Sequence, residues 1–338
     1  MRFLFWGTPA YAVPSLNALV AAGHRLVGVV TQPDRRRGRG AALVPSAVKA
    51  RALELQAELG QAIPVFTPER IRREPATQQA LAELGADVSV VVAFGQLLPP
   101  EVLAQPAYGC WNGHGSLLPR WRGAAPIQWS LIEGDGETGV GIMAMEAGLD
   151  TGPVLLERSL AMGLLENAGQ LAERLSGLTA ELLVEALPLI EAAGPGPQQE
   201  RLTRLGMEPQ PSEGVTLARL LTKDDFLVDW QQPALAIHRR VMGLYPGAHC
   251  QWQGKRLKLL ATEPLVHRLA VQLSGEAAAL SGQPWPKAEP GSVLERVKGV
   301  GLVLATGGCP LLLRSAQLEG KAAAGGPELL QQLRAQDP

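Results

Sequence analysis

The chain has 338 residues, of which 46% are hydrophobic and 19% charged, and its 31 Lys and Arg nearly balance its 32 Asp and Glu. This composition excludes an intrinsically disordered chain, which would combine low hydrophobicity with a high net charge. It also excludes a collagen or coiled-coil protein, because the 38 Gly and 27 Pro are scattered without a period. The length suits one large domain or, by preference, two.

Cysteine usage and apolar segments bear on the compartment. The three cysteines are far apart and lack a C-x-x-C spacing, which favours a reducing, cytoplasmic compartment. The apolar stretch after Arg2 superficially resembles a secretory signal, but Pro9 and Pro14 interrupt it. The most apolar segment elsewhere, residues 88–98, is about half as long as a spanning helix requires. We therefore expect no signal peptide and no membrane segment.

The first half of the chain alternates short β-rich runs with helical patterns. Continuous valine-rich runs between helices indicate strands buried on both faces, and therefore a parallel sheet with crossover helices. We predict an α/β domain with a Rossmann-like, mostly parallel sheet and flanking helices. The predicted strands are residues 2–6, 26–31, 65–66, 87–93, 109–114, 140–145 and 154–159, and the predicted helices are residues 13–22, a helix opening at 45–46, 68–84 and 167–193.

The segment Gly194-Pro195-Gly196-Pro197 can continue neither a helix nor a strand and is the clearest linker signal in the chain. The pattern of predicted elements changes after it. An amphipathic helix at 235–244 and several short strands follow, as is typical of a small OB-like β-barrel. Residues 270–290, rich in Ala, Gly, Pro and Ser, are interpreted as a surface insertion. The predicted strands are residues 249–252, 256–260, 291–294, 301–305 and 310–313, and the predicted parts are a catalytic domain at 1–194, a linker at 195–214 and a C-terminal β-barrel at 215–338.

The charges are segregated along the chain. Residues 1–53 carry a single acid, Asp34, against eight basic residues, whereas residues 151–214 are mostly acidic and residues 215–338 are again basic. If these two basic regions lie on one face of the protein, a polyanion can bind across both. Otherwise the basic residues are simply solvated at the surface.

Two motifs, a dinucleotide-binding turn and a nucleophilic serine, are incomplete in this sequence. Pro9 stands where a dinucleotide-binding turn needs its second glycine, and proline has no backbone amide to donate. Ser116 lacks the glycines that flank a nucleophilic serine, because His114 and Leu118 occupy those positions. The other histidines lack metal-ligand spacing. We therefore expect neither a nicotinamide or flavin site nor a serine nucleophile, and no metal.

The most informative pattern lies at residues 111–123, which begin at the end of a predicted strand, where open α/β sheets place their ligand clefts. Residues two apart on a strand share a face, so Asn112 and His114 should project together. A carboxamide beside an imidazole suits stabilisation of an oxyanion and handling of a proton, and Asp150 in a later loop can orient the imidazole. The alternative is that the three residues merely end strands and turns.

The pattern Asn-x-His-x-Ser-Leu-Leu-Pro-x-x-Arg-Gly at 112–123, followed by Gly-Leu-Asp-Thr-Gly at 148–152, resembles the folate-dependent formyltransferases. The resemblance covers nearly the whole chain, from residues 5–9 to residues 317–321. Together with the C-terminal barrel, it implies transfer of the formyl group of 10-formyltetrahydrofolate to the free amino group of methionyl initiator tRNA. Folate is then a co-substrate, and no metal is required.

The resemblance also implies roles for single residues. Asn112 and protonated His114 would stabilise the tetrahedral oxyanion, and Asp150 would position His114. The implied folate site comprises Ser116, Leu117, Leu118 and Pro119 on one wall and Phe94, Gly95, Leu97 and Pro99 on the other.

A basic loop provides a second candidate site. Arg35, Arg36, Arg37 and Arg39 stand among glycines, and fixed positive charge in such a loop suits the sugar-phosphate of a tRNA acceptor end. On charge alone, a solvated loop is the alternative. The resemblance implies that the loop contacts the acceptor stem, although residues 41–42 are Ala where further Lys or Arg would be expected.

Two other functions remain open at the level of sequence. One is a related formyltransferase or hydrolase that uses the same Asn-His-Asp set on a nucleotide-sugar amine or on water. The other is a non-enzymatic RNA-binding module, which would explain the arginines but not Asn112, His114 and Asp150. We expect a monomeric protein without a membrane partner.

Overall fold

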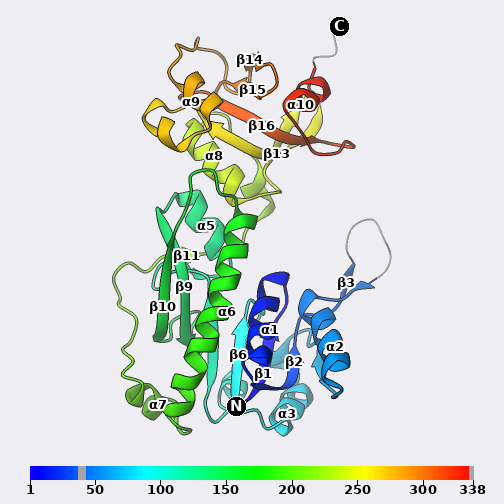
Figure 1. Ribbon diagram of the computed structural model, residues 1–338, viewed down its shortest axis with the longest axis vertical. Helices are drawn as coiled ribbons and strands as arrows, with labels where there is room; N and C mark the ends of the chain where they lie inside the picture. The colour runs from blue at the N-terminus through cyan, green and yellow to red at the C-terminus, as the bar shows by residue number, and fades with distance from the viewer. Residues whose placement is uncertain (37–42, 335–338) are drawn as a thin grey trace. The chain divides into compact units, whose positions relative to one another are not determined.

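The computed structural model describes residues 1–36 and 43–334. The chain divides into two compact units (Figure 1). Unit 1 comprises Met1–Pro126, Thr138–Leu160 and Ala172–Arg219, and unit 2 comprises Ile127–Glu137, Ala161–Leu171 and Leu220–Pro338. Residues 195–214 therefore group with unit 1. The functional division at 1–194, 195–214 and 215–338 stays a prediction.

A seven-stranded sheet forms the centre of unit 1. Its strands are β1 (Arg2–Gly7), β2 (Arg25–Val30), β5 (Val65–Phe66), β6 (Val88–Val92), β7 (Cys110–His114), β9 (Glu137–Ala144) and β10 (Val154–Ala161). Their order is β10-β9-β7-β6-β1-β2-β5. The pairs from β7 through β6, β1 and β2 to β5 are parallel, whereas β7 and β9 are antiparallel. This arrangement confirms the predicted mostly parallel α/β sheet.

The central strands of the sheet are buried on both faces, as their valine-rich runs predicted. All five residues of β6 are buried, and Trp6 on β1 is fully buried, with its ring packed edge-on against Phe94 at 5.2 Å. A Cβ at Gly113 on β7 would meet the Thr179 side chain of a long helix, which therefore approaches the sheet closely at that glycine. Unit 1 contains α1 (Val13–Ala21), α2 (Ala47–Leu59), α3 (Pro75–Glu83), α4 (Pro100–Leu103), α7 (Gln198–Arg204) and most of α6 (Ala168–Ala192).

The predicted helix at 68–84 is wrong in extent. Residues Ile71–Arg73 form a separate 3-10 turn, and α3 begins only at Pro75. Proline lacks the amide that would continue a preceding helix and disfavours helical backbone in the residue before it. Along residues 1–36 and 43–334, every helix falls short of the length or the apolarity that crossing a bilayer demands.

Unit 2 contains an antiparallel sheet, as expected for the C-terminal part. Its strands follow the order β12-β13-β16-β15-β14, and β17 pairs with β16. Helix α8 packs against this sheet through Ile237 and Val241, which join one core with the buried leucines of the strands. The bounds are β12 (His249–Trp252), β13 (Lys255–Pro264), β14 (Val293–Val297), β15 (Gly301–Leu304), β16 (Leu311–Leu318), β17 (Ala324–Gly325), α5 (Pro126–Glu133, whose first residue belongs to unit 1), α8 (Ala234–Gly243), α9 (Gly275–Ser281) and α10 (Gly326–Gln332).

The interpretation of residues 270–290 as a surface insertion is wrong for their central part. Helix α9 buries Ala277 and Leu280 in a core cluster with residues of the sheet. Ser274 caps this helix by accepting a hydrogen bond from the Ala277 amide at 3.2 Å, and its own amide donates to the buried Glu263 carboxylate at 2.7 Å. The alanine-rich composition concealed an apolar helical face.

Candidate active site

The three residues predicted to act together lie around the carboxyl end of β7. Asn112 and His114 stand two residues apart on this strand, and Asp150 lies in the loop between β9 and β10. The His114 Nδ1 atom is 3.7 Å from Asp150 Oδ2, and the two side chains are only 6% and 12% exposed. Asn112 is partly buried and pairs with Val91 of β6 and Met143 of β9.

One hydrogen bond determines which nitrogen of His114 is available for chemistry. Nε2 lies 2.9 Å from the backbone carbonyl oxygen of Trp121. A carbonyl can only accept, so Nε2 carries a proton and donates it. The other nitrogen, Nδ1, is the one that faces Asp150.

Asp150 is held by two independent contacts. Its Oδ2 atom accepts a hydrogen bond from the Gly123 amide at 2.8 Å. Its backbone carbonyl accepts a second bond, at 2.9 Å, from Nε2 of Gln210, which also donates to Gly152 O at 2.6 Å. Asp150 has a left-handed backbone with φ of 51°, which is uncommon for a residue other than glycine and persists only where its surroundings impose it.

Sequence reasoning missed the segment that carries these contacts. Gln210 falls in the predicted linker, yet Arg122 donates to its Oε1 from Nε at 3.0 Å and from Nη2 at 2.7 Å. Nearby, β8 (Arg122–Gly123) pairs in parallel with β11 (Leu217–Ala218). Two-residue strands are too short for a periodic pattern, so the sequence contains no signal for this pairing. The prolines on both sides of Gln210 are the one local hint, since they favour an extended backbone.

Only some residues of the first predicted folate wall are accessible to solvent. Ser116 is fully buried, and its hydroxyl donates to the Arg120 carbonyl at 2.7 Å. Leu118 is 9% exposed, whereas Leu117 and Pro119 are partly buried. Ser116 therefore shapes the turn, and Leu117 and Pro119 present the accessible surface.

The second predicted folate wall follows β6. Gly95 and Leu97 are exposed, whereas Phe94 and Pro99 are buried. The Phe94 ring packs on Trp6 in the core. This wall therefore offers the backbone around Gly95 and the side chain of Leu97 to a ligand.

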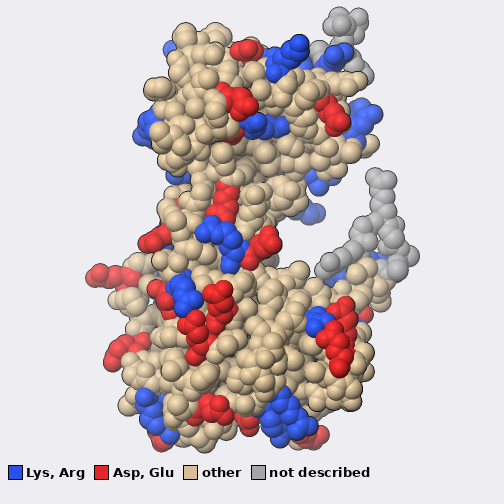
Figure 2. Space-filling model, viewed as in Figure 1, with Lys and Arg blue, Asp and Glu red and all other residues tan. Residues whose placement is uncertain are grey.

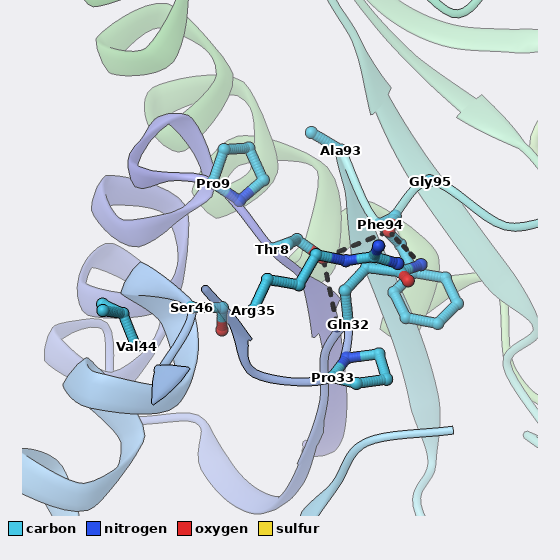
Figure 3. A pocket seen from close by; sticks show the side chains of 10 residues that line it. All are labelled: Thr8, Pro9, Gln32, Pro33, Arg35, Val44, Ser46, Ala93, Phe94 and Gly95. Atoms are coloured by element: carbon cyan, nitrogen blue, oxygen red, sulfur yellow. Dashed lines mark hydrogen bonds between the residues drawn. The ribbon is translucent and has the colours of Figure 1, made fainter. Parts of the chain in front are cut away.

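A cavity of about 380 Å³ opens at the carboxyl ends of β1, β2 and β6 (Figure 3). In open α/β sheets this edge is where ligands bind. The cavity brings together Phe94 and Gly95 of the predicted folate wall and Arg35 of the predicted tRNA loop. The Phe94 carbonyl accepts hydrogen bonds from Thr8 Oγ1 at 3.1 Å and Gln32 Nε2 at 3.2 Å. The other lining residues are Pro9, Pro33, Val44, Ser46 and Ala93.

Only part of the basic loop belongs to the described chain. Arg35 and Arg36 form β3, which pairs antiparallel with β4 (Leu43–Val44), and both arginines are exposed. Arg37 and Arg39 lie outside the described residues. Figure 2 shows Lys and Arg interspersed with Asp and Glu on the face in view, without one continuous basic surface among the residues described there.

A metal centre and a thiol nucleophile each have requirements with which the described residues can be compared. Among the described residues, no group of three or more His, Cys, Asp or Glu lies close enough to hold a metal ion. Burial raises the pKa of the Cys110 thiol on β7 to about 12, so this thiol is protonated at neutral pH. Cys110 is therefore not a thiolate nucleophile at neutral pH.

Comparisons with known proteins identify the family of this chain. Residues 1–187 match the family described as "Formyl transferase", and residues 220–334 match "Formyl transferase, C-terminal domain". The chain is 75% identical to the methionyl-tRNA formyltransferase of Synechococcus sp. (strain RCC307), over 98% of this chain and 100% of that one. It is 64% identical to the methionyl-tRNA formyltransferase of Parasynechococcus marenigrum (strain WH8102), over 99% and 97%.

A solved structure shares the fold. The N-formyltransferase from Helicobacter canadensis, in complex with folinic acid and dTDP-3-aminofucose, superposes with a TM-score of 0.62 at 13% identity, covering 93% of this chain and 98% of that one. The two family matches and the near full-length relatives cover most of both units. The chain belongs to the formyl transferase family.

Proposed function

We propose that this chain transfers the formyl group of 10-formyltetrahydrofolate to the free amino group of methionyl initiator tRNA, as required for the initiation of translation. Relatives at 75% and 64% identity over nearly the full length are methionyl-tRNA formyltransferases. The observation that carries the proposal is the pairing of His114 Nδ1 with Asp150 Oδ2 at 3.7 Å, beside Asn112 on the same strand.

The chemistry needs an oxyanion site and a path for one proton. The acceptor amine attacks the formyl carbon and forms a new C–N bond, which gives a tetrahedral stage. The bond to the folate nitrogen then breaks, and the proton that the amine sheds ends on that nitrogen. In the tetrahedral stage, negative charge develops on the formyl oxygen. Donors already in place for such a charge lower the barrier because they need no reorganisation.

Asn112 and His114 provide the donors. The Asn112 carboxamide offers N–H groups, and protonated His114 offers Nδ1–H because its Nε2–H is committed to the Trp121 carbonyl. The Asp150 carboxylate stabilises positive charge on the imidazole and takes part in passing on the proton of the amine.

We assign the folate to the walls at Ser116, Leu117, Leu118 and Pro119 and at Phe94, Gly95, Leu97 and Pro99. Exposed Leu97 on one wall and partly buried Leu117 on the other supply apolar surface for a flat ring system. The cavity beside Phe94 and Gly95 leaves room next to this wall for the second substrate.

We assign the acceptor end of the tRNA to the arginine loop, with Arg35, Arg36, Arg37 and Arg39 as contacts. Exposed Arg35 and Arg36 support this assignment, and Arg35 lines the cavity at the sheet edge. In the predicted C-terminal domain at 215–338, exposed Lys255 and Arg256 on β13 offer further phosphate contacts.

We further propose that the protein works as a monomer in the cytoplasm. Asn112, His114 and Asp150 all come from one chain, so the catalytic set needs no second copy. Light scattering coupled to gel filtration at micromolar concentration should give the mass of one chain, and a dimer mass would contradict the monomer.

The deciding experiment offers the purified protein 10-formyltetrahydrofolate with one of two acceptors, methionylated initiator tRNA or a dTDP-amino sugar. We expect a blocked methionyl amine on the tRNA and no formylated sugar. Formylation of the sugar alone would contradict the proposal, and so would hydrolysis of the folate without transfer.

The arginine loop has its own test. Replacing Arg35 and Arg36 together by Ala should raise the KM for the tRNA by about tenfold, because two phosphate contacts are lost. The KM for the folate should stay within about twofold. Replacing exposed Arg268, outside the proposed site, provides the matched control. An unchanged KM for the tRNA would remove the loop from the site.

A further inference from the structure

The segment between the sheet and the C-terminal part contributes a residue to the catalytic centre. We propose that Gln210 is a positioning residue, whose carboxamide holds the Asp150 loop so that the carboxylate faces Nδ1 of His114. This inference rests on the proposed function, because it assigns Gln210 a part in the same formyl transfer.

The contacts of Gln210 span the loop on both sides of Thr151. Its Nε2 donates to Asp150 O at 2.9 Å and to Gly152 O at 2.6 Å. The two hydrogens of one amide group thus fix two backbone carbonyls that are two residues apart. No other described side chain donates to either carbonyl, so the loop's backbone depends on this amide.

Arg122 fixes the orientation of that carboxamide. Its guanidinium donates to Gln210 Oε1 from Nε at 3.0 Å and from Nη2 at 2.7 Å. Because a guanidinium can only donate, the amide oxygen must face Arg122 and the amide nitrogen must face the loop. Both ends of the Gln210 side chain are therefore satisfied in one orientation only.

The same strand also holds the carboxylate. Gly123, next to Arg122 on β8, donates its amide to Asp150 Oδ2 at 2.8 Å. Strand β8 is in turn paired with β11, a few residues after Gln210, and the Trp121 amide donates to Thr216 Oγ1 at 2.9 Å. Two short segments that contact each other, residues 121–123 and residues 210–218, thus anchor the carboxylate and the backbone of Asp150.

Asp150 needs such an anchor because its backbone is in a costly conformation. Its φ of 51° is a left-handed value that a free loop would leave. Pro209 and Pro211 restrict the backbone on both sides of Gln210, so its side chain is presented from a stiff segment. Without the two donated bonds, we expect the loop to relax and the carboxylate to shift relative to His114.

The first experiment compares Q210E and Q210M with the control Q198E in steady-state formylation of methionyl initiator tRNA. Both Gln210 variants lose the donations to the loop, whereas Q210E keeps an acceptor for Arg122. Gln198 lies in the same segment and donates to the Met145 carbonyl at 3.3 Å, at the start of the β9–β10 loop rather than at Asp150 or Gly152. For both Gln210 variants we expect kcat to fall about 10- to 100-fold, as displacement of a catalytic group by about 1 Å produces. The KM values of both substrates should stay within about twofold.

The second experiment places Q210M in a D150N background and measures single turnovers with enzyme in excess. If Gln210 acts through the carboxylate, the double variant should be no slower than D150N by more than about twofold. Multiplicative losses in the two variants overturn the proposal. So does a kcat loss no larger than that of Q198E, or a loss of thermal stability in both Gln210 variants that exceeds that of Q198E by more than about 5 °C. Wild-type protein that forms no formylmethionyl-tRNA refutes the proposed function instead.

Discussion

Replacing Asp150 by Asn isolates the charge of the proposed catalytic set. In the native chain the carboxylate accepts a hydrogen bond from the Gly123 amide at 2.8 Å. The asparagine side chain has the same shape and still offers an oxygen to this amide. What disappears is the attraction between the carboxylate and a positive imidazole at 3.7 Å. At an effective dielectric constant of about 20, that attraction is about 4 kcal/mol. Since about 1.4 kcal/mol is one factor of ten in rate, kcat should fall by about 10² to 10³.

The assay is formylation of methionyl initiator tRNA under saturating folate, with the melting temperature measured alongside. We expect the melting temperature of Asp150→Asn to stay within about 2 °C of the wild type, because the hydrogen bond from Gly123 survives. A matched control is Asp135→Asn, an acid in the turn after α5 rather than in the catalytic loop. A kcat within about threefold of the wild type would show that the carboxylate plays no electrostatic part.

Three further predictions concern the structure around the site and the fold. Arg201→Ala leaves two backbone carbonyls without the guanidinium that donates to them, so urea unfolding should show a loss of about 2 kcal/mol. Gly152→Ala should fold but lose most of its kcat, because the added Cβ collides with the Ala144 carbonyl and displaces the catalytic loop. Burial lowers the pKa of His238, so the folded state disfavours its protonated form. The contribution of His238 to the free energy of unfolding should therefore be at its maximum above about pH 6.5 and should decrease below that pH, by at most about 1.4 kcal/mol per pH unit. In urea titrations between about pH 7 and 5.5, His238→Gln should reduce this pH dependence.

The sheet could be predicted because its signals are local. The valine run of β6 is buried throughout, and alternation along β7 correctly placed Asn112 and His114 on one strand, at the edge where ligands bind. Residues 167–193 were interpreted as helical, and helix α6 begins and ends within one residue of these bounds. Where composition replaced periodicity, as in the alanine-rich segment around α9, the interpretation failed.

The details of the site depended on contacts that sequence does not encode locally. The ring of Phe94, a residue proposed for the folate wall, packs on the Trp6 ring at 5.2 Å. The hydroxyl of Ser116, also proposed for the folate site, donates to the Arg120 carbonyl at 2.7 Å. In both cases a neighbour brought near by folding satisfies the side chain, and no pattern within the motif reveals that neighbour.

There is a physical reason why the motif reveals the candidate catalytic residues but not the groups that hold them in place. The groups that hold His114 and Asp150 are mostly backbone atoms: the Trp121 carbonyl, the Gly123 amide and the carbonyls that Gln210 fixes. Backbone groups exist at every position whatever the residue, so they leave no trace in a sequence motif. The side chain of Gln210 is the exception, and it stands 60 residues from Asp150. The motif therefore identifies the chemistry, while the rate of that chemistry depends on a distant segment that looks like a linker.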